Sequence, residues 1–127
     1  MENVVVLAHD EIVRVDPLVL SDLVQQMGEA GAEGVISRAM EETASRLSLI
    51  EHCYCQGDEE ALWKSAKGLI GIAEQIGMVS LAEASRAVAE CARSTDRVAL
   101  AAVLARLIRL GDRSLTAMWE MPETYTN

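Results

Sequence analysis

Lysines and glycines share one predicted helix face in the middle of the chain. Spacings of three and four residues place on this face, with one glycine at its margin, Lys64, Lys67, Gly68, Gly71 and Glu74. A lysine ammonium is protonated near neutral pH, so it attracts anionic groups but has no lone pair for nucleophilic attack. A glycine inside a helix costs about 1 kcal/mol relative to alanine, and its missing side chain permits close approach. These residue types predict contact with an anionic partner group and no catalytic residue.

The helix that positions these residues is predicted within Asp58 to Met78, ending at Gly77. Asp58 is the expected N-cap, and the two glutamates that follow it complement the positive end of the helix. Apolar residues recur at alternating spacings of four and three and form one buried stripe, which comprises Leu62, Ala66, Leu69, Ala73 and Ile76. The lysines are expected to point to the opposite side, toward solvent.

The preceding segments predict an arm and two further helices. Residues 1–15 are rich in β-branched residues and are expected to form an extended arm or a short irregular helix, because a lone strand has no partner. Asp16 and Pro17 form a helix start, and Gly28 is expected to end that short helix as a left-handed cap. A longer amphipathic helix is predicted from about Gly31 to Gln56.

Two more helices are predicted after the central one. Ser80 and Glu83 have the spacing of a capping box, which would open a helix that runs through Arg93. The last helix is expected to be capped within residues 94–96 and to kink or split at Gly111.

Four long amphipathic helices with short connections predict an all-α fold, an antiparallel up-down four-helix bundle with a short N-terminal helix at one end. We expect an N-terminal arm over residues 1–15, a bundle over residues 16–121 and a loose tail over residues 122–127. Half of the residues are apolar (50%) and only 3% are aromatic, so the core must be built mainly from aliphatic side chains and methionine.

Charge and cysteine content exclude several classes of function. A formal net charge of −9 repels phosphate backbones and anionic lipids, so neither nucleic acid nor a membrane is expected as a partner. No apolar run approaches the ~20 residues of a membrane span, and the chain does not start like a signal peptide, which predicts a cytoplasmic protein. Cys53, Cys55 and Cys91 lack C-x-x-C spacing and are expected to be free thiols, with no metal site and no cofactor.

The central helix and its flanks resemble the histidine-containing phosphotransfer (HPt) domains of two-component phosphorelays. Residues at matching positions, without a gap, are Gly57, Asp58, Leu62, Ala66, Leu69, Gly71, Ala73, Ile76, Gly77, Leu81, Ala82 and Val88. The resemblance covers roughly residues 16–109. Lys67 stands at the position of the phosphorylatable histidine, and Ile70 stands where the family has a lysine that assists phosphoryl chemistry. The resemblance therefore implies an HPt-like frame without its phosphoacceptor.

The resemblance implies a module of a phosphorelay that binds a receiver domain or a histidine kinase and modulates signalling without phosphotransfer. The charge of Lys67 would then lie near the carboxylate cluster of a receiver. The expected partner-binding surface comprises Lys64, Lys67, Gly68, Ile70, Gly71 and Glu74. We expect a monomer that is not an enzyme.

Three alternatives remain open at this stage. The chain could be an active phosphotransfer protein that uses His52, which is expected to face solvent, or His9. It could instead be a helical structural or oligomerisation module unrelated to signalling, in which Trp63, Ile70 and Ile72 are exposed as a self-contact. Finally, the lysines and glycines could lie on an ordinary solvated face, with the tryptophan covering the edge of the core.

Overall fold

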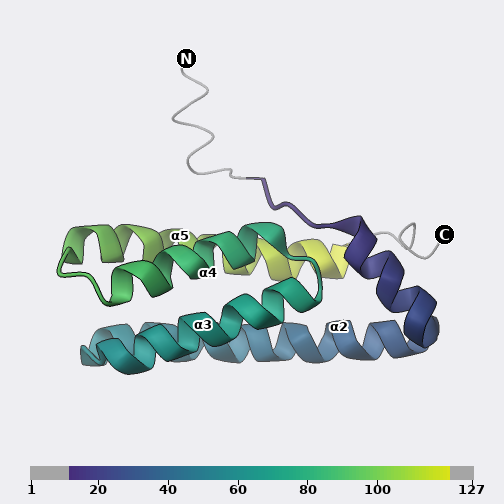
Figure 1. The fold of residues 1–127 in the computed structure, drawn as a ribbon, viewed down its shortest axis with the longest axis horizontal. Helices are drawn as coiled ribbons and strands as arrows, with labels where there is room; N and C mark the ends of the chain where they lie inside the picture. The colour runs from purple at the N-terminus through teal and green to yellow at the C-terminus, as the bar shows by residue number, and fades with distance from the viewer. Residues whose placement is uncertain (1–11, 121–127) are drawn as a thin grey trace, which may run out of the picture.

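The computed structural model describes residues 12–120, and within that range the fold is all-α, as predicted (Figure 1). Its four helices are α2 (Pro17–Gln56), α3 (Glu59–Gln75), α4 (Val79–Ala92) and α5 (Arg97–Glu120). Each helix packs on the next along the chain, and α5 also contacts α2, which closes a four-helix bundle. No helix in this range is both long enough and apolar enough to cross a membrane.

Helix α2 consists of two helical segments that meet at a sharp bend. The Asp16 carboxylate accepts a hydrogen bond from Leu18 N at 3.0 Å, and Pro17 takes the first helical position, as predicted. Gly28 has φ 76° and ψ 170°, and the chain turns there from the short purple segment into the long blue one (Figure 1). The predicted break at Gly28 is confirmed, although its ψ is extended rather than left-handed helical.

Residues 12–16 run against the turn between α3 and α4. Asp16 N donates to Gly77 O at 2.7 Å, and Val79 N donates to Arg14 O at 3.0 Å. A bridge between Val15 and Met78 completes this pairing. The part of the predicted arm that the structure describes is therefore extended and tied to the bundle. Residues 1–11, with His9, and the predicted tail lie outside the described residues.

The predicted capping box at the start of α4 is wrong. The helix begins at Val79 after Met78, and no side chain caps it. Ser80 lies inside the helix, and its hydroxyl accepts a hydrogen bond from Arg14 N at 2.8 Å. The Glu83 carboxylate pairs with the Arg14 guanidinium. Both side chains therefore bind the arm, which a local pattern within the helix does not reveal.

Helix α5 runs without a break through Gly111, so the predicted kink is also wrong. The helix does begin as predicted, because the Asp96 carboxylate accepts a hydrogen bond from Ala99 N at 2.9 Å. Gly111 is buried against Leu47 of α2, and a Cβ atom at this position would lie 2.5 Å from Leu47 Cδ1. The glycine is required by close packing of α5 on α2.

A Gly111→Ala substitution is expected to destabilise the fold by about 1–3 kcal/mol, because the added methyl overlaps a core leucine in a packed interior. The matched control is Gly71→Ala, where a Cβ would meet nothing within 4 Å. That variant is expected to be more stable by up to about 1 kcal/mol, from helix propensity alone. Urea unfolding followed by circular dichroism measures both. Equal stability of the two variants would contradict the packing role of Gly111.

Ser114 of α5 is fully buried, and its hydroxyl has no hydrogen-bond partner among the described residues. An unsatisfied buried hydroxyl costs roughly 1–3 kcal/mol, so Ser114→Ala is expected to raise the melting temperature. Ser85 is the control, because it is equally buried but donates to Leu81 O at 2.8 Å. Ser85→Ala removes a satisfied hydrogen bond and is expected to give no such gain. A Ser114→Ala variant that melts below the parent protein would refute the assignment.

Candidate docking surface on helix α3

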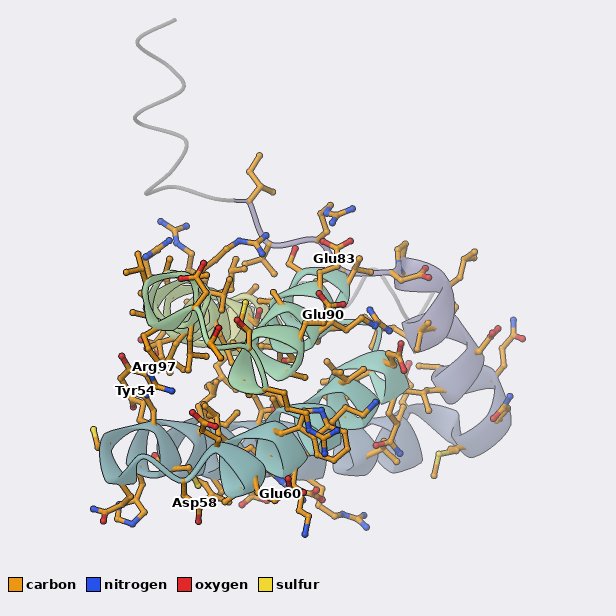
Figure 2. All side chains as sticks on the ribbon, turned by 60° about the vertical axis from the view of Figure 1, so that its left-hand side comes forward. Tyr54, Asp58, Glu60, Glu83, Glu90 and Arg97 are labelled. Carbon is orange, nitrogen blue, oxygen red and sulfur yellow. The ribbon has the colours of Figure 1, made fainter. Side chains whose placement is uncertain are left out.

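Helix α3 presents its lysines outward because its cap and its apolar stripe fix its rotation. The Asp58 carboxylate accepts a hydrogen bond from Ala61 N at 3.1 Å, which confirms the predicted N-cap. Figure 2 shows Asp58 at the end of the bundle where α3 begins. The predicted stripe is buried, each member being at most 1% exposed: Leu62, Ala66, Leu69, Ala73 and Ile76.

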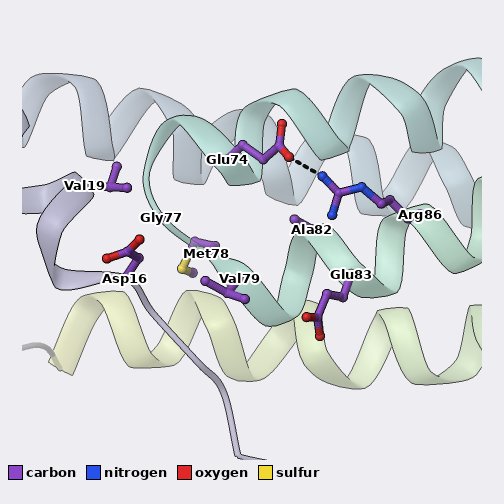
Figure 3. A pocket seen from close by; sticks show the side chains of 9 residues that line it. All are labelled: Asp16, Val19, Glu74, Gly77, Met78, Val79, Ala82, Glu83 and Arg86. Carbon is purple, nitrogen blue, oxygen red and sulfur yellow. Dashed lines mark hydrogen bonds and ion pairs between the residues drawn. The ribbon is translucent and has the colours of Figure 1, made fainter.

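The acidic side chains of α3 are all turned toward arginines of the following helices. Glu59 Oε2 accepts a hydrogen bond from Arg97 Nη1 at 2.8 Å. Glu60 Oε1 lies 3.5 Å from Arg93 Nη2, and the Glu74 carboxylate pairs with the Arg86 guanidinium of α4 (Figure 3). Such exposed pairs add little to stability. They do neutralise the carboxylates of α3 along the side that faces α4.

The two lysines of α3 are exposed and make no ion pair among the side chains that the structure describes. Lys67 Nζ lies 5.7 Å from the centroid of the Trp63 ring, and Arg93 Cζ lies 3.6 Å from the same centroid. Trp63 itself is half-buried and packs against the core. It therefore covers the core edge, as one interpretation predicted, and it also holds two cations by cation–π attraction.

The two glycines of the surface differ in their surroundings. A Cβ at Gly71 would meet nothing within 4 Å, so this position is open to an approaching partner. A Cβ at Gly68 would lie 2.7 Å from Arg46 Nη1, because the guanidinium of this α2 residue covers the glycine. The group that closely approaches Gly68 is therefore a side chain of the same protein, and not a partner. Arg46 was missed in the sequence, since the pattern of α2 places it only beside the apolar stripe.

The predicted surface residues fall into three strips across α3. Lys64, Lys67 and Gly71 are exposed along its outer face. Ile70 is half-buried and lines a cavity of about 270 Å³ between α3 and α4, together with Trp63, Lys67, Arg86, Ala89 and Glu90. Glu74 is held by its arginine on the same α4 side, and Gly68 faces α2. Among these six predicted residues, the unpaired charges are those of Lys64 and Lys67 on the outer strip.

Comparison with known proteins does not identify a function for this surface. No family model, curated protein or solved structure matches the chain. What the surface can do must therefore be argued from the side chains that it contains.

The residues of the alternative hypotheses are also placed, except His9. His52 is exposed near the end of α2. The three residues expected to be exposed in a self-contact are half-buried instead, and Trp63 and Ile72 pack against the core. The large apolar side chains that are exposed among the described residues lie elsewhere in the chain: Ile12, Leu18, Met27, Leu49 and Val98.

The cysteines and the acidic residues form no metal-binding group in the part of the chain that the structure describes. Cys53 is buried, Cys91 is half-buried and Cys55 is exposed, and all three are free thiols. The site is therefore best described by charge and accessibility rather than by a reactive group.

Proposed function

We propose that this protein is an HPt-like module of a two-component phosphorelay, which binds a receiver domain or a histidine kinase and modulates signalling without carrying phosphate. The main support for this proposal is Lys67, which is exposed on α3 and has no ion-pair partner among the described side chains. The sequence resemblance puts the phosphorylatable histidine at this position. The module acts in the cytoplasm as a monomer.

The architecture supports this proposal through its connections. Gly57 and Asp58 alone link α2 to α3, and residues 76–78 link α3 to α4. Connections this short join neighbouring helices that run in opposite directions, so we assign the bundle the up-down antiparallel order of HPt domains. In such a bundle the middle of α3 is accessible from outside and lies far from the connecting turns.

The charge distribution supports an acidic partner site. Two opposite charges 4 Å apart attract by about 4 kcal/mol at an effective dielectric constant of 20, before desolvation is subtracted. Lys64 and Lys67 would gain this attraction at the carboxylate cluster of a receiver, while the chain as a whole carries −9 and is repelled by acidic proteins. The open space at Gly71 admits the partner backbone. The lysines therefore determine where an acidic partner docks.

A Lys67→Glu substitution is expected to weaken binding to the partner roughly 10- to 100-fold, equivalent to about 1.4–2.8 kcal/mol. The measurement is a titration of a panel of receiver domains and kinases against the natural protein and the variant. Arg109→Glu serves as the charge-matched control, because Arg109 is exposed on α5, which packs on α4 and α2 but not on α3. Affinities that stay unchanged in Lys67→Glu for every partner would remove Lys67 from the interface.

A further inference from the structure

We infer that Arg46, Lys64 and Lys67 form one cationic cluster around Gly68 and Gly71, and that it binds the phosphoryl group of a phosphorylated receiver. The inference rests on the proposed function for the identity of the partner. It adds a residue from α2 to the surface and a preference for one state of that partner. The cluster would therefore recognise a phosphorylated receiver without removing its phosphate.

The first argument is the separation of charge across α3. Its three acidic side chains are each paired with an arginine on the side of α4 and α5. Arg46, Lys64 and Lys67, by contrast, take part in no ion pair among the described side chains. In a chain of net charge −9, these three cations outnumber the carboxylate of Glu90, which lines a cavity with Lys67, and they create a local positive potential. Such a potential favours an anion supplied from outside.

The second argument is the position of Arg46. Above Gly68, the ideal Cβ position lies 2.7 Å from Nη1, 3.1 Å from Cζ and 3.5 Å from Nη2, so the guanidinium occupies the space of the missing side chain. Arg46 is half-buried, and it reaches α3 from the neighbouring helix. A guanidinium at this position offers a planar fork of N–H donors, which matches the oxygens of a phosphoryl group. Gly68 is thus the residue that allows Arg46 to join the cluster.

The third argument is the number of charges. Lys64 precedes Gly68 by one helical turn, and Lys67 is its neighbour in sequence, so both belong to the same stretch of α3 as the glycine that Arg46 covers. A carboxylate brings one negative charge and two oxygens, whereas a phosphoryl group brings close to two charges and three acceptor oxygens. Three cations are therefore better matched by the phosphoryl group. Because Lys67 is a protonated amine, the group can be bound there without being transferred.

The first test needs no receiver. Inorganic phosphate and acetate are titrated at constant ionic strength, and the amide signals of Gly68 and Gly71 and the Nε–H signal of Arg46 are followed by NMR. We expect these signals to shift with phosphate and to respond at least about tenfold more weakly to acetate. The response should disappear in Arg46→Gln and persist in the charge-matched Arg109→Gln. Signals that do not respond to phosphate, or that respond equally to acetate, would overturn the inference.

A second variant separates the position of Arg46 from its charge. Gly68→Ala keeps every charge but places a methyl where the guanidinium lies. The arginine end is flexible and alanine favours the helix, so this variant is expected to fold and yet to lose the phosphate response. Retention of the full response in Gly68→Ala would contradict the role assigned to the glycine.

The third measurement compares receivers before and after modification of their aspartate with beryllofluoride, a stable phosphoryl mimic. We expect about tenfold tighter binding of the modified form, and loss of this difference in Arg46→Gln. Equal binding of both forms would overturn this inference and leave the proposed function standing. A phosphate response without binding of any receiver would support the cluster as a phosphoryl site and contradict the proposed function.

Discussion

A Lys67→His variant is expected to accept a phosphoryl group from a phosphorylated receiver, whereas the natural protein stays unlabelled. A neutral imidazole carries a lone pair on one ring nitrogen, which a lysine ammonium lacks. In the expected step, an N–P bond forms at that nitrogen while the O–P bond of the aspartyl phosphate breaks and the carboxylate leaves. Residue 67 is exposed, so the substitution should not disturb folding. The measurement is acid-labile label on the variant after incubation with radiolabelled receivers.

Two control variants show which histidine carries any label. Lys64→His places an imidazole on the same exposed face three residues earlier and is expected to remain unlabelled, because its position does not correspond to that of the phosphoacceptor. His52→Ala, combined with Lys67→His, removes the exposed histidine of α2 and should leave the label unchanged. Label on the natural protein that disappears in His52→Ala would identify His52 as a phosphoacceptor and would refute the proposed function.

A second substitution, at Ile70, tests whether the rate of labelling can be raised further. Ile70 lies in the cavity beside Lys67, at the position where the HPt resemblance expects a lysine that assists transfer. A second cation near the phosphoryl oxygens stabilises the charge that they carry during transfer. Lys67→His combined with Ile70→Lys should therefore be labelled faster than Lys67→His alone. Faster labelling would indicate that the surface has the geometry of a phosphotransfer site and lacks only these two side chains.

The helices and their caps could be predicted because both depend on local sequence. The stripe that includes Leu62 and Leu69 has a helical period, and burial of that stripe follows from it directly. Asp58 was predicted as a cap and Asp96 was one of three cap candidates, and each accepts a backbone hydrogen bond from a residue three positions later. These signals act within one turn of helix, so no knowledge of the tertiary fold is needed to read them.

The wrong predictions concern residues that fit a local sequence pattern but contact a segment that is distant in sequence. Ser80 was assigned to a helix cap, and it binds Arg14 of the arm. Gly111 was read as a kink, and it admits Leu47 of α2. Gly68 was expected to face a partner and is covered by a residue of α2. In each case the competing partner lies far away in sequence, so helical periodicity and capping rules contain no information about it.

A Gly77→Ala substitution is expected to destabilise the fold by about 3 kcal/mol, the largest loss among the glycine variants. Gly77 has φ 73°, where an L-residue is strained, and its Cβ would lie 2.8 Å from the backbone oxygen of Asp16. Backbone cannot move aside as the end of an arginine can, so the arm must shift. The hydrogen bond from Asp16 N to Gly77 O would be lost with it.

Gly57→Ala is the control that separates these two causes. Gly57 has nearly the same backbone conformation, with φ 72°, but a Cβ there meets nothing within 4 Å. Its substitution should therefore cost only the conformational strain, about 1–2 kcal/mol. Urea unfolding gives both losses, and their difference measures how strongly the arm is held against the α3–α4 turn. Faster hydrogen exchange at Val79 N, whose amide bonds to Arg14 O, should accompany Gly77→Ala alone. Equal losses in the two variants would show that the arm contributes nothing to the stability of the bundle.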